Sequence, residues 1–269
     1  MKRLVRILKV VVLILFVAWV FWANTALELN TMVVEEANLP AAFDGFRIAH
    51  ISDFHSSGRM TKKVIEKLKL AKPDIICITG DLMDSRDDTA DVALAFVEEA
   101  VKIAPCYFVT GNHEKLISEE LYTALLQGLQ EKGVILLDDR AVFLQKNGAE
   151  VILAGHFWGD TDEIDSISNF DGYRILLSHQ PESFLDYAEA KYDLVLVGHA
   201  HGGQFRLPFL GGVYAPGQGF FPEYDAGIYS QNQTDMIVSR GIGNSTIPLR
   251  FNNRPEIVLV ELKCLTEAT

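Results

Sequence analysis

The chain has 269 residues, of which 49% are hydrophobic and 22% are charged, and its formal net charge at pH 7 is −12. This length and apolar fraction suit one globular domain with a substantial core, or two small domains. So acidic a chain lacks the basic surface expected of a protein that binds the phosphate backbone of nucleic acid, and we predict no nucleic-acid partner.

The N-terminal segment has the composition of a membrane anchor. Residues 10–27 carry no charged side chain, which is close to the ~20 apolar residues that a spanning helix needs. Trp19 and Trp22 lie toward its far end, where aromatic residues meet the membrane interface. Basic residues precede the stretch and Glu28 follows it, so the positive-inside rule predicts a single-pass protein with a cytoplasmic N-terminus and an extracytoplasmic domain. A cleavable signal peptide is the alternative, because residues 23–26 are small and polar.

Beyond this segment, apolar runs of strand length alternate with helical patterns. An extended lead-in over 32–44 comes first, and a segment rich in Gly, Pro and aromatic residues, 207–243, predicts loops with short strands. The expected strands are 46–52, 75–79, 107–110, 134–136, 142–144, 151–154, 175–178, 194–197 and 257–262. The expected helices are 61–71, 87–103, 118–132 and one that begins at Pro181. This order predicts an α/β layered domain with a central sheet or two stacked sheets.

Polar side chains suited to metal binding follow the ends of five of these strands. They are Asp53, Asp81, Asn112, His179 and His199. Ligands of α/β sheets bind outside the carboxyl ends of the strands, so we expect these side chains to converge on one site.

Five sequence blocks contain these residues. They are Asp53-Phe54-His55, Gly80-Asp81, Gly111-Asn112-His113-Glu114, Ser178-His179 and Gly198-His199-Ala200-His201. In this order they resemble the signature of the calcineurin-like metallophosphoesterases, D-x-H, G-D, G-N-H-[DE], H and G-H-x-H. The resemblance implies a four-layer α/β/β/α sandwich, in which two mixed β-sheets are flanked by helices, preceded here by a transmembrane helix. We therefore divide the chain into a basic stub with its anchor, residues 1–31, and a metallophosphoesterase domain, residues 32–269.

The resemblance also implies a binuclear metal site, with Asp81 in the bridging position. Asp53, His55 and His201 would complete the ligands of one divalent ion, and Asn112, His179 and His199 those of the other. Nitrogen and oxygen ligands without thiolate favour Mn, Fe or Zn over Mg or Ca, and we expect manganese, with iron and zinc as alternatives.

By the same resemblance, a hydroxide bridging the two ions would attack a phosphoric ester in line. His113 matches the catalytic histidine of the family and is expected to act as the general acid that protonates the leaving oxygen. Glu114 is expected to orient His113 or cap a helix, and Asp84 either to support the site or to face solvent. The two glycines after His201 would leave room for substrate and loop to approach both metals.

Three further stretches resemble a membrane-anchored bacterial subfamily, the YkuE- and YaeI-type phosphohydrolases: residues 39–55, 198–208 and 241–256. They contain Arg206, Arg250 and Arg254, which could bind a phosphate or could pair with carboxylates of this acidic domain. Tyr224, with Tyr214, Phe220 and Phe221, could contact an acyl chain or a base, or could form the core of its own loop.

We predict that the substrate is a phosphodiester or diphosphate, with lipid-linked and cell-envelope phosphoesters as the candidates. One alternative is a pyrophosphatase acting on a lipid precursor of the UDP-2,3-diacylglucosamine type. An alternative of another class is a non-catalytic metal-binding scaffold that kept the fold.

Overall fold

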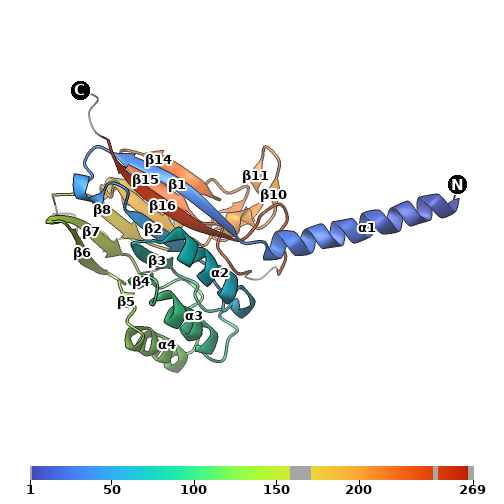
Figure 1. The fold of residues 1–269 in the computed structure, drawn as a ribbon, viewed down its shortest axis with the longest axis horizontal. Coiled ribbons are helices and arrows are strands. Elements are labelled where there is room, and N and C mark those ends of the chain that lie inside the picture. The colour runs from blue at the N-terminus through green and yellow to red at the C-terminus, as the bar shows by residue number, and fades with distance from the viewer. Residues whose placement is uncertain (1, 158–170, 245–247, 266–269) are drawn as a thin grey trace.

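A computed structural model of the chain describes residues 2–157, 171–244 and 248–265. One long helix, α1 (Lys2–Thr25), projects away from a layered domain that contains the other elements (Figure 1). Among the described residues, α1 is the one helix that is both long enough and apolar enough to cross a membrane.

The first of two large sheets contains both ends of the domain's chain. Its six strands are ordered β1 (Glu28–Glu36), β16 (Glu256–Cys264), β2 (Arg47–Ile51), β3 (Ile75–Thr79), β4 (Cys106–Val109) and β5 (Ile135–Leu136). Strands β2 to β5 are parallel, whereas β16 runs antiparallel to β2 and parallel to β1. The start of β1 therefore lies at the same edge of the sheet as the end of β2.

The second sheet is also mixed and has six strands. They are ordered β14 (Gly227–Gln231), β15 (Thr234–Val238), β9 (Leu194–Val197), β8 (Arg174–Leu177), β7 (Ala149–Gly155) and β6 (Arg140–Lys146). Strands β15, β9, β8 and β7 are parallel, and β14 and β6 run antiparallel at the two outer edges.

Helices cover the outer face of each sheet. The first sheet packs against α2 (Gly58–Ala71), α3 (Asp91–Ala100) and α4 (Glu119–Glu131), and the second against α5 (Phe184–Glu189). A third apolar cluster fills the space between the sheets, with side chains such as Val258 from the first sheet and Leu196 from the second. The predicted four-layer α/β/β/α sandwich, with an apolar helix before it, is confirmed (Figure 1).

Short elements complete the chain. The single-turn 3-10 helices are η1 (Ala41–Phe43), η3 (Pro181–Ser183) and η4 (His201–Gly203). Two small hairpins follow η4, formed by β10 (Arg206–Leu207) with β11 (Gly211–Gly212) and by β12 (Tyr214–Ala215) with β13 (Gly219–Phe220).

The structure differs from the sequence expectations at both edges of the sandwich. Residues 28–36 form a full strand that pairs along its whole length with β16, so this strand crosses the predicted boundary between residues 31 and 32. The segment expected to be loops with short strands contains β14 and β15, and the difference is that these two strands extend the second sheet. Both differences arise from strand pairing between distant segments, which local hydrophobic patterns do not reveal.

Candidate metal centre

The predicted ligands meet where the carboxyl ends of the two sheets come together. Asp53 and His55 follow β2, Asp81 follows β3, Asn112 follows β4, His179 follows β8, and His199 and His201 follow β9. The two aspartates and four histidines are buried, and Asn112 is half-buried. A set of charged and polar groups enclosed in this way requires partners, because unpaired burial is costly.

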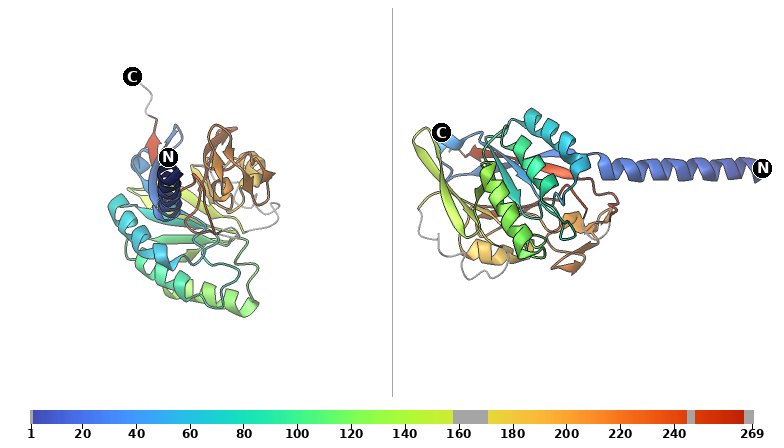
Figure 2. Two further views of the ribbon diagram at one scale, coloured as in Figure 1. Left: turned by 90° about the vertical axis from the view of Figure 1, so that its right-hand side faces the viewer. Right: turned by 90° about the horizontal axis from the view of Figure 1, so that it is seen from below.

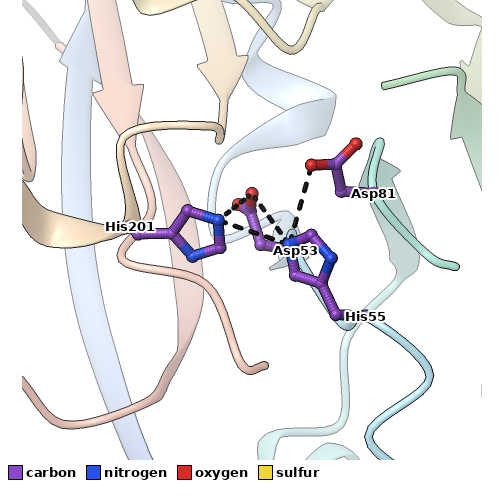
Figure 3. A group of neighbouring side chains, drawn as sticks. All are labelled: Asp53, His55, Asp81 and His201. Atoms are coloured by element: carbon purple, nitrogen blue, oxygen red, sulfur yellow. Dashed lines mark hydrogen bonds and ion pairs between the residues drawn. The ribbon is translucent and has the colours of Figure 1, made fainter. Parts of the chain in front are cut away.

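One group of ligands surrounds Asp53, and Figure 3 shows the four side chains pointing toward one another. The Nε2 atoms of His55 and His201 lie 3.3 Å apart. Asp53 Oδ1 is 3.4 Å from His201 Nε2 and 3.9 Å from His55 Nε2. Asp81 Oδ2 completes the group, at 3.6 Å from His55 Nε2.

The second group lies on the other side of Asp81 and contains His179, His199 and Asn112. Asp81 Oδ2 is 3.3 Å from His179 Nε2, which is in turn 3.2 Å from Asn112 Oδ1. The opposite ring nitrogen, His179 Nδ1, donates to the carbonyl of Thr79 at 2.6 Å, so Nε2 is the atom that faces the cluster. The rings of His179 and His199 are 5.0 Å apart.

One oxygen of the Asp81 carboxylate lies between the two groups of ligands. Its Oδ1 accepts the backbone N–H of His113 at 2.8 Å. Its Oδ2 faces His55 on one side and His179 on the other. One carboxylate oxygen is therefore shared between the two sets of ligands.

Unusual backbone geometry brings the ligands inward. Five of them have positive φ angles of 45–64°, namely Asp53, His55, Asp81, His199 and His201. This left-handed region costs a residue with a side chain roughly 1–2 kcal/mol, so the surrounding contacts must hold it. Glycines permit those contacts: a Cβ on Gly198 would lie 2.5 Å from Asp53 Oδ2, and one on Gly111 would meet the Asp81 carboxylate.

Burial controls the charge of most of the imidazoles. Desolvation lowers the pKa of His55 to about 4 and of His199 to about 3, and it lowers the pKa of His201 well below its ordinary value. These three rings are therefore neutral at pH 7, the form that binds metal. Burial opposes a charge on His179 too, but the carboxylate of Asp81 raises its pKa to about 10.

The carboxyl groups of Asp53 and Asp81 also differ in pKa, because their charged neighbours differ. Desolvation raises the pKa of Asp53 to about 6, and the nearby Asp81 adds to this rise. Burial alone would raise the pKa of Asp81 as well, but the facing His179 holds it well below its usual range. The cluster thus combines buried carboxylates with the neutral imidazoles of His55, His199 and His201, and this donor set fits divalent cations.

A model of the calcineurin-like phosphoesterase family matches residues 46–203, which include all the ligands described above. The chain belongs to this family. The metallophosphoesterase YkuE of Bacillus subtilis is 31% identical over 253 residues, which cover 88% of this chain and 86% of that protein.

Two further relatives have informative names. The Escherichia coli protein named phosphodiesterase YaeI is 28% identical over 229 residues, covering 81% of this chain and 82% of that protein. A Bos taurus transmembrane protein with a metallophosphoesterase domain is 30% identical over 261 residues, which cover 87% of this chain and 56% of that protein. The chain is thus a hydrolase of phosphoesters. Its buried histidines and aspartates form a binding site for divalent metal.

In this metallophosphoesterase, His113 lies at the open side of the cluster. Its Nδ1 accepts the backbone N–H of Ser85 at 2.9 Å, so the proton of the neutral ring is on Nε2. That Nε2 is 4.0 Å from Asp81 Oδ2, and the side chain keeps 13% of its surface exposed. His113 can therefore present an N–H donor to a group bound at the metal site.

Glu114 and Asp84 hold the loops of the site. The buried carboxylate of Glu114 accepts backbone N–H groups of Asp81, Met83 and Gly111, each at 2.9 Å, so it ties the loop after β3 to the loop after β4. Asp84 is ion-paired with Arg86 and lies 3.7 Å from His55 Nδ1. Both residues position ligands.

The arginines chosen as substrate contacts have other partners. Arg250 has no exposed surface, and its guanidinium donates to Asn244 and to the carbonyls of Arg240 and Gly243. This burial contradicts the prediction that Arg250 contacts substrate, because an enclosed guanidinium cannot reach a ligand.

The other two arginines pair with carboxylates, which was the alternative interpretation. Arg254 donates to Glu28 and lies over the ring of Trp22, at the junction with α1. Arg206 is 3.0 Å from Asp225 Oδ2. A substrate contact by Arg206 stays a prediction.

The aromatic residues of the loops are divided between two environments. Tyr224 is half-buried, and its ring packs edge-on against Phe184 and Tyr229, so a role for it in substrate binding also stays a prediction. Phe220 and Phe221 are exposed, so they do not form the core of the loop.

The sequence analysis selected residues 241–256 for their resemblance to the subfamily, but it did not predict that the loop after β15, residues 240–244, supports the metal ligands. A Cβ on Gly241 would lie 2.6 Å from the Cβ of Asp53, and one on Gly243 would lie 2.9 Å from that of His55. A strand followed by glycines was the available signal, but β15 was not recognised. Gly202 and Gly203 approach Asn253 and Gly212, so they leave room for protein segments rather than for substrate.

Proposed function

We propose that this metallophosphoesterase hydrolyses a phosphodiester or diphosphate with two divalent ions. Asp53, His55 and His201 would hold one ion and Asn112, His179 and His199 the other, with Asp81 shared between them. The single observation that carries this proposal is the position of Asp81 Oδ2 between the two groups of ligands. A pair of such ions supplies an activated water and neutralises the charge of the phosphoryl oxygens.

His113 is the general acid in this proposal. The Ser85 N–H bonds to Nδ1 of the neutral ring, so the acid form requires that Nδ1 take up a proton and give up this bond. Nε2, which faces the cluster, would then pass its proton to the leaving oxygen, and the ring would return to the neutral form. A general acid of this kind contributes roughly 10²–10⁴ in rate. Its contribution grows as the leaving group becomes more basic.

The donor set favours manganese, with iron or zinc as alternatives. The proposed ligands are imidazole nitrogens, carboxylates and one amide oxygen, a combination that suits Mn, Fe and Zn better than Mg or Ca. Metal analysis of the purified protein by mass spectrometry, with the metal varied in the assay, decides among them.

The apolar helix α1 anchors the protein in a membrane, with the N-terminus in the cytoplasm and the catalytic domain outside. Support comes from the length of α1, from the basic residues at its start and from a relative named as a transmembrane protein. A reporter enzyme fused to the C-terminus tests the orientation: activity restricted to the cytoplasm would reverse it.

The enzyme activity is tested on the full chain in detergent with bis-p-nitrophenyl phosphate and Mn²⁺. We expect Asp81→Ala to lose both metal and activity, while Asp88→Ala, the same change at an exposed site, keeps both. His113→Ala should keep its metal and lose rate by roughly 10²–10⁴, with a larger loss on a diester that has a poorer leaving group. Full activity in both site variants would refute the assignment, and inactivity of the wild type with every metal would favour a metal-binding scaffold.

A further inference from the structure

The C-terminal end of α1 is packed into the domain. Ala23 and Leu27 are buried, and the side chain of Asn24 bonds both the N–H and the carbonyl of Arg250, at 2.7 and 2.9 Å. Only residues 26 and 27 separate α1 from β1. The helix and the domain therefore have a fixed relative orientation.

These contacts fall inside the charge-free part of the helix. The ring of Trp19 meets that of Phe251 at 5.2 Å, and the guanidinium of Arg254 lies 4.5 Å from the centre of the Trp22 ring. Since an α-helix rises about 1.5 Å per residue, the segment 250–254 overlaps roughly the last 9 Å of α1. With α1 in a bilayer, this part of the domain lies at the membrane interface.

The metal site lies at the same end of the domain as the contact between α1 and residues 250–254. Glu28 pairs with Glu256 and His50 pairs with Val258, so the first residues of β1 and the last residues of β2 lie at the same end of the sheet, on either side of β16. Asn253 also links the two regions, because its side chain donates to the carbonyl of His201 at 2.7 Å. The site therefore lies at the end of the sandwich from which the helix leaves.

Two hairpins at this end expose apolar side chains. Figure 2 shows the β10–β11 and β12–β13 hairpins at the end of the domain from which α1 projects. They are joined to the helix contact, because Arg206 donates its backbone N–H to Phe251, and to the metal-ligand loop, because Val213 donates to Gly203. Their exposed residues, called here the apolar rim, are Leu207, Phe209, Leu210, Tyr214, Phe220 and Phe221.

We propose that the apolar rim inserts into the surface of the bilayer that α1 crosses, so that the metal site receives a phosphoester borne by a membrane lipid. This inference rests on the proposed function and specifies its substrate class. A bilayer explains the exposure of this set, since aromatic and aliphatic side chains beside an anchor are stabilised at the membrane interface. The continuous contact from α1 through Phe251 to the β10–β11 hairpin places the rim at the level of the interface.

The position of the rim is tested with spin labels on the full chain in phosphatidylcholine vesicles. Labels are attached to Phe209→Cys and Phe220→Cys in a Cys264→Ser background, since Cys77 and Cys106 are buried. The matched control is Phe143→Cys, an exposed position on β6. We expect the rim labels to be relaxed by oxygen and shielded from a water-soluble nickel chelate, with the control label showing the reverse.

Two outcomes of the labelling would overturn the proposal. Rim labels as accessible to the nickel chelate as the label at 143 would show that the hairpins remain in water. Labels shielded from both relaxants, with dipolar broadening between copies, would show that a second copy of the chain covers the rim.

The substrate class is tested with two diesters that share a leaving group. One is bis-p-nitrophenyl phosphate in detergent, and the other is a phosphatidyl-p-nitrophenol carried as a minor component of phosphatidylcholine vesicles. For Phe209→Ser/Phe220→Ser we expect unchanged rates on the soluble diester and a loss of about tenfold on the vesicle diester, equivalent to ~1.4 kcal/mol of membrane interaction. Phe143→Ser/Leu185→Ser, at exposed sites outside the rim, should lose neither activity.

The outcomes separate this inference from the proposed function. Equal effects of the rim variant on the two diesters, or a wild type that cleaves only the soluble one, would refute the lipid substrate and leave the hydrolase intact. A wild type inactive on both diesters would refute the proposed function. The spin labels would then test only whether the apolar rim inserts into the bilayer.

Discussion

Gly198→Ala tests the packing that brings His199 and Asp53 together. Gly198 lies between β9 and the two ligands of the following loop, and a Cβ at this position would be 1.7 Å from Ser52 Oγ and 2.5 Å from Asp53 Oδ2. Its φ is not in the left-handed region, so alanine adds no backbone strain and the perturbation is purely steric.

The expected magnitude follows from these distances. An ordinary contact of a Cβ begins at 3.4 Å, so the Asp53 carboxylate must move by about 0.9 Å. A displacement of about 1 Å at a reacting centre can cost roughly 10²-fold in rate. Overpacking of a dense interior costs about 1–3 kcal/mol of stability. We therefore expect a folded but less stable variant with a rate about a hundredfold lower at saturating metal.

The assay measures kcat on bis-p-nitrophenyl phosphate, metal content and urea unfolding for the same preparations. Gly58→Ala is the control, because its Cβ would meet nothing nearer than 3.3 Å. Adding Ser52→Gly to Gly198→Ala removes the worst clash, so it should restore stability more than activity, since the contact with Asp53 remains. Wild-type rate and metal content in Gly198→Ala would refute the close approach of these two loops.

Three further predictions concern protons and buried hydrogen bonds. Burial, with Asp235 and Asp193 nearby, raises the pKa of Glu36 from 4.5 to about 7, so the folded state binds this proton more tightly than the unfolded chain. Stability should therefore fall as the pH rises through that range, and Glu36→Gln should be more stable than wild type at pH 8 in urea unfolding. His179, with its pKa raised to about 10, must release a proton when metal binds, so affinity measured by calorimetry should rise about tenfold per pH unit below that value. Glu114→Gln replaces one of two accepting oxygens with an amide donor, and we expect a loss of about 1–3 kcal/mol in unfolding free energy together with weaker metal binding.

Each of these predictions has a control. Glu35→Gln changes the exposed neighbour of Glu36 and should leave the pH profile of stability unchanged. Metal binding without proton release at pH 8, measured in buffers of different ionisation enthalpy, would contradict the assignment of His179. Glu120→Gln, on the exposed face of α4, should not alter stability. An equally small effect of Glu114→Gln would show that its hydrogen bonds do not hold the two loops.

Much of the fold and the chemistry of the site can be predicted from local patterns. The apolar runs before Asp53, Asp81 and His199 are strands β2, β3 and β9, and the turn residues after them carry the ligand chemistry. Such patterns follow from the burial of central parallel strands on both faces, which gives nearly continuous apolar sequence. The edge strand β1 has alternating exposure and could not be recognised in this way.

The function of individual charged residues was the part that local patterns could not predict. Arg250 and Arg254 stand in a stretch suited to phosphate binding, yet one is enclosed beneath the loop after β15 and the other packs on Trp22. A guanidinium has the same sequence signature in either place. That of Arg250 is enclosed by Asn244 and the carbonyls of Arg240 and Gly243, whereas that of Arg254 pairs with Glu28, which is far away in the sequence.

The sequence by itself determined the family, the layered α/β fold, the apolar N-terminal helix and the residue types of the metal site, because each depends on local composition or on motifs in fixed order. Only the tertiary structure decided that one oxygen of Asp81 is shared by two ligand groups. It also decided that the site lies at the end of the domain from which α1 leaves. Both facts depend on the register between strands distant in the chain, and that register is set by packing across two sheets rather than by any local pattern.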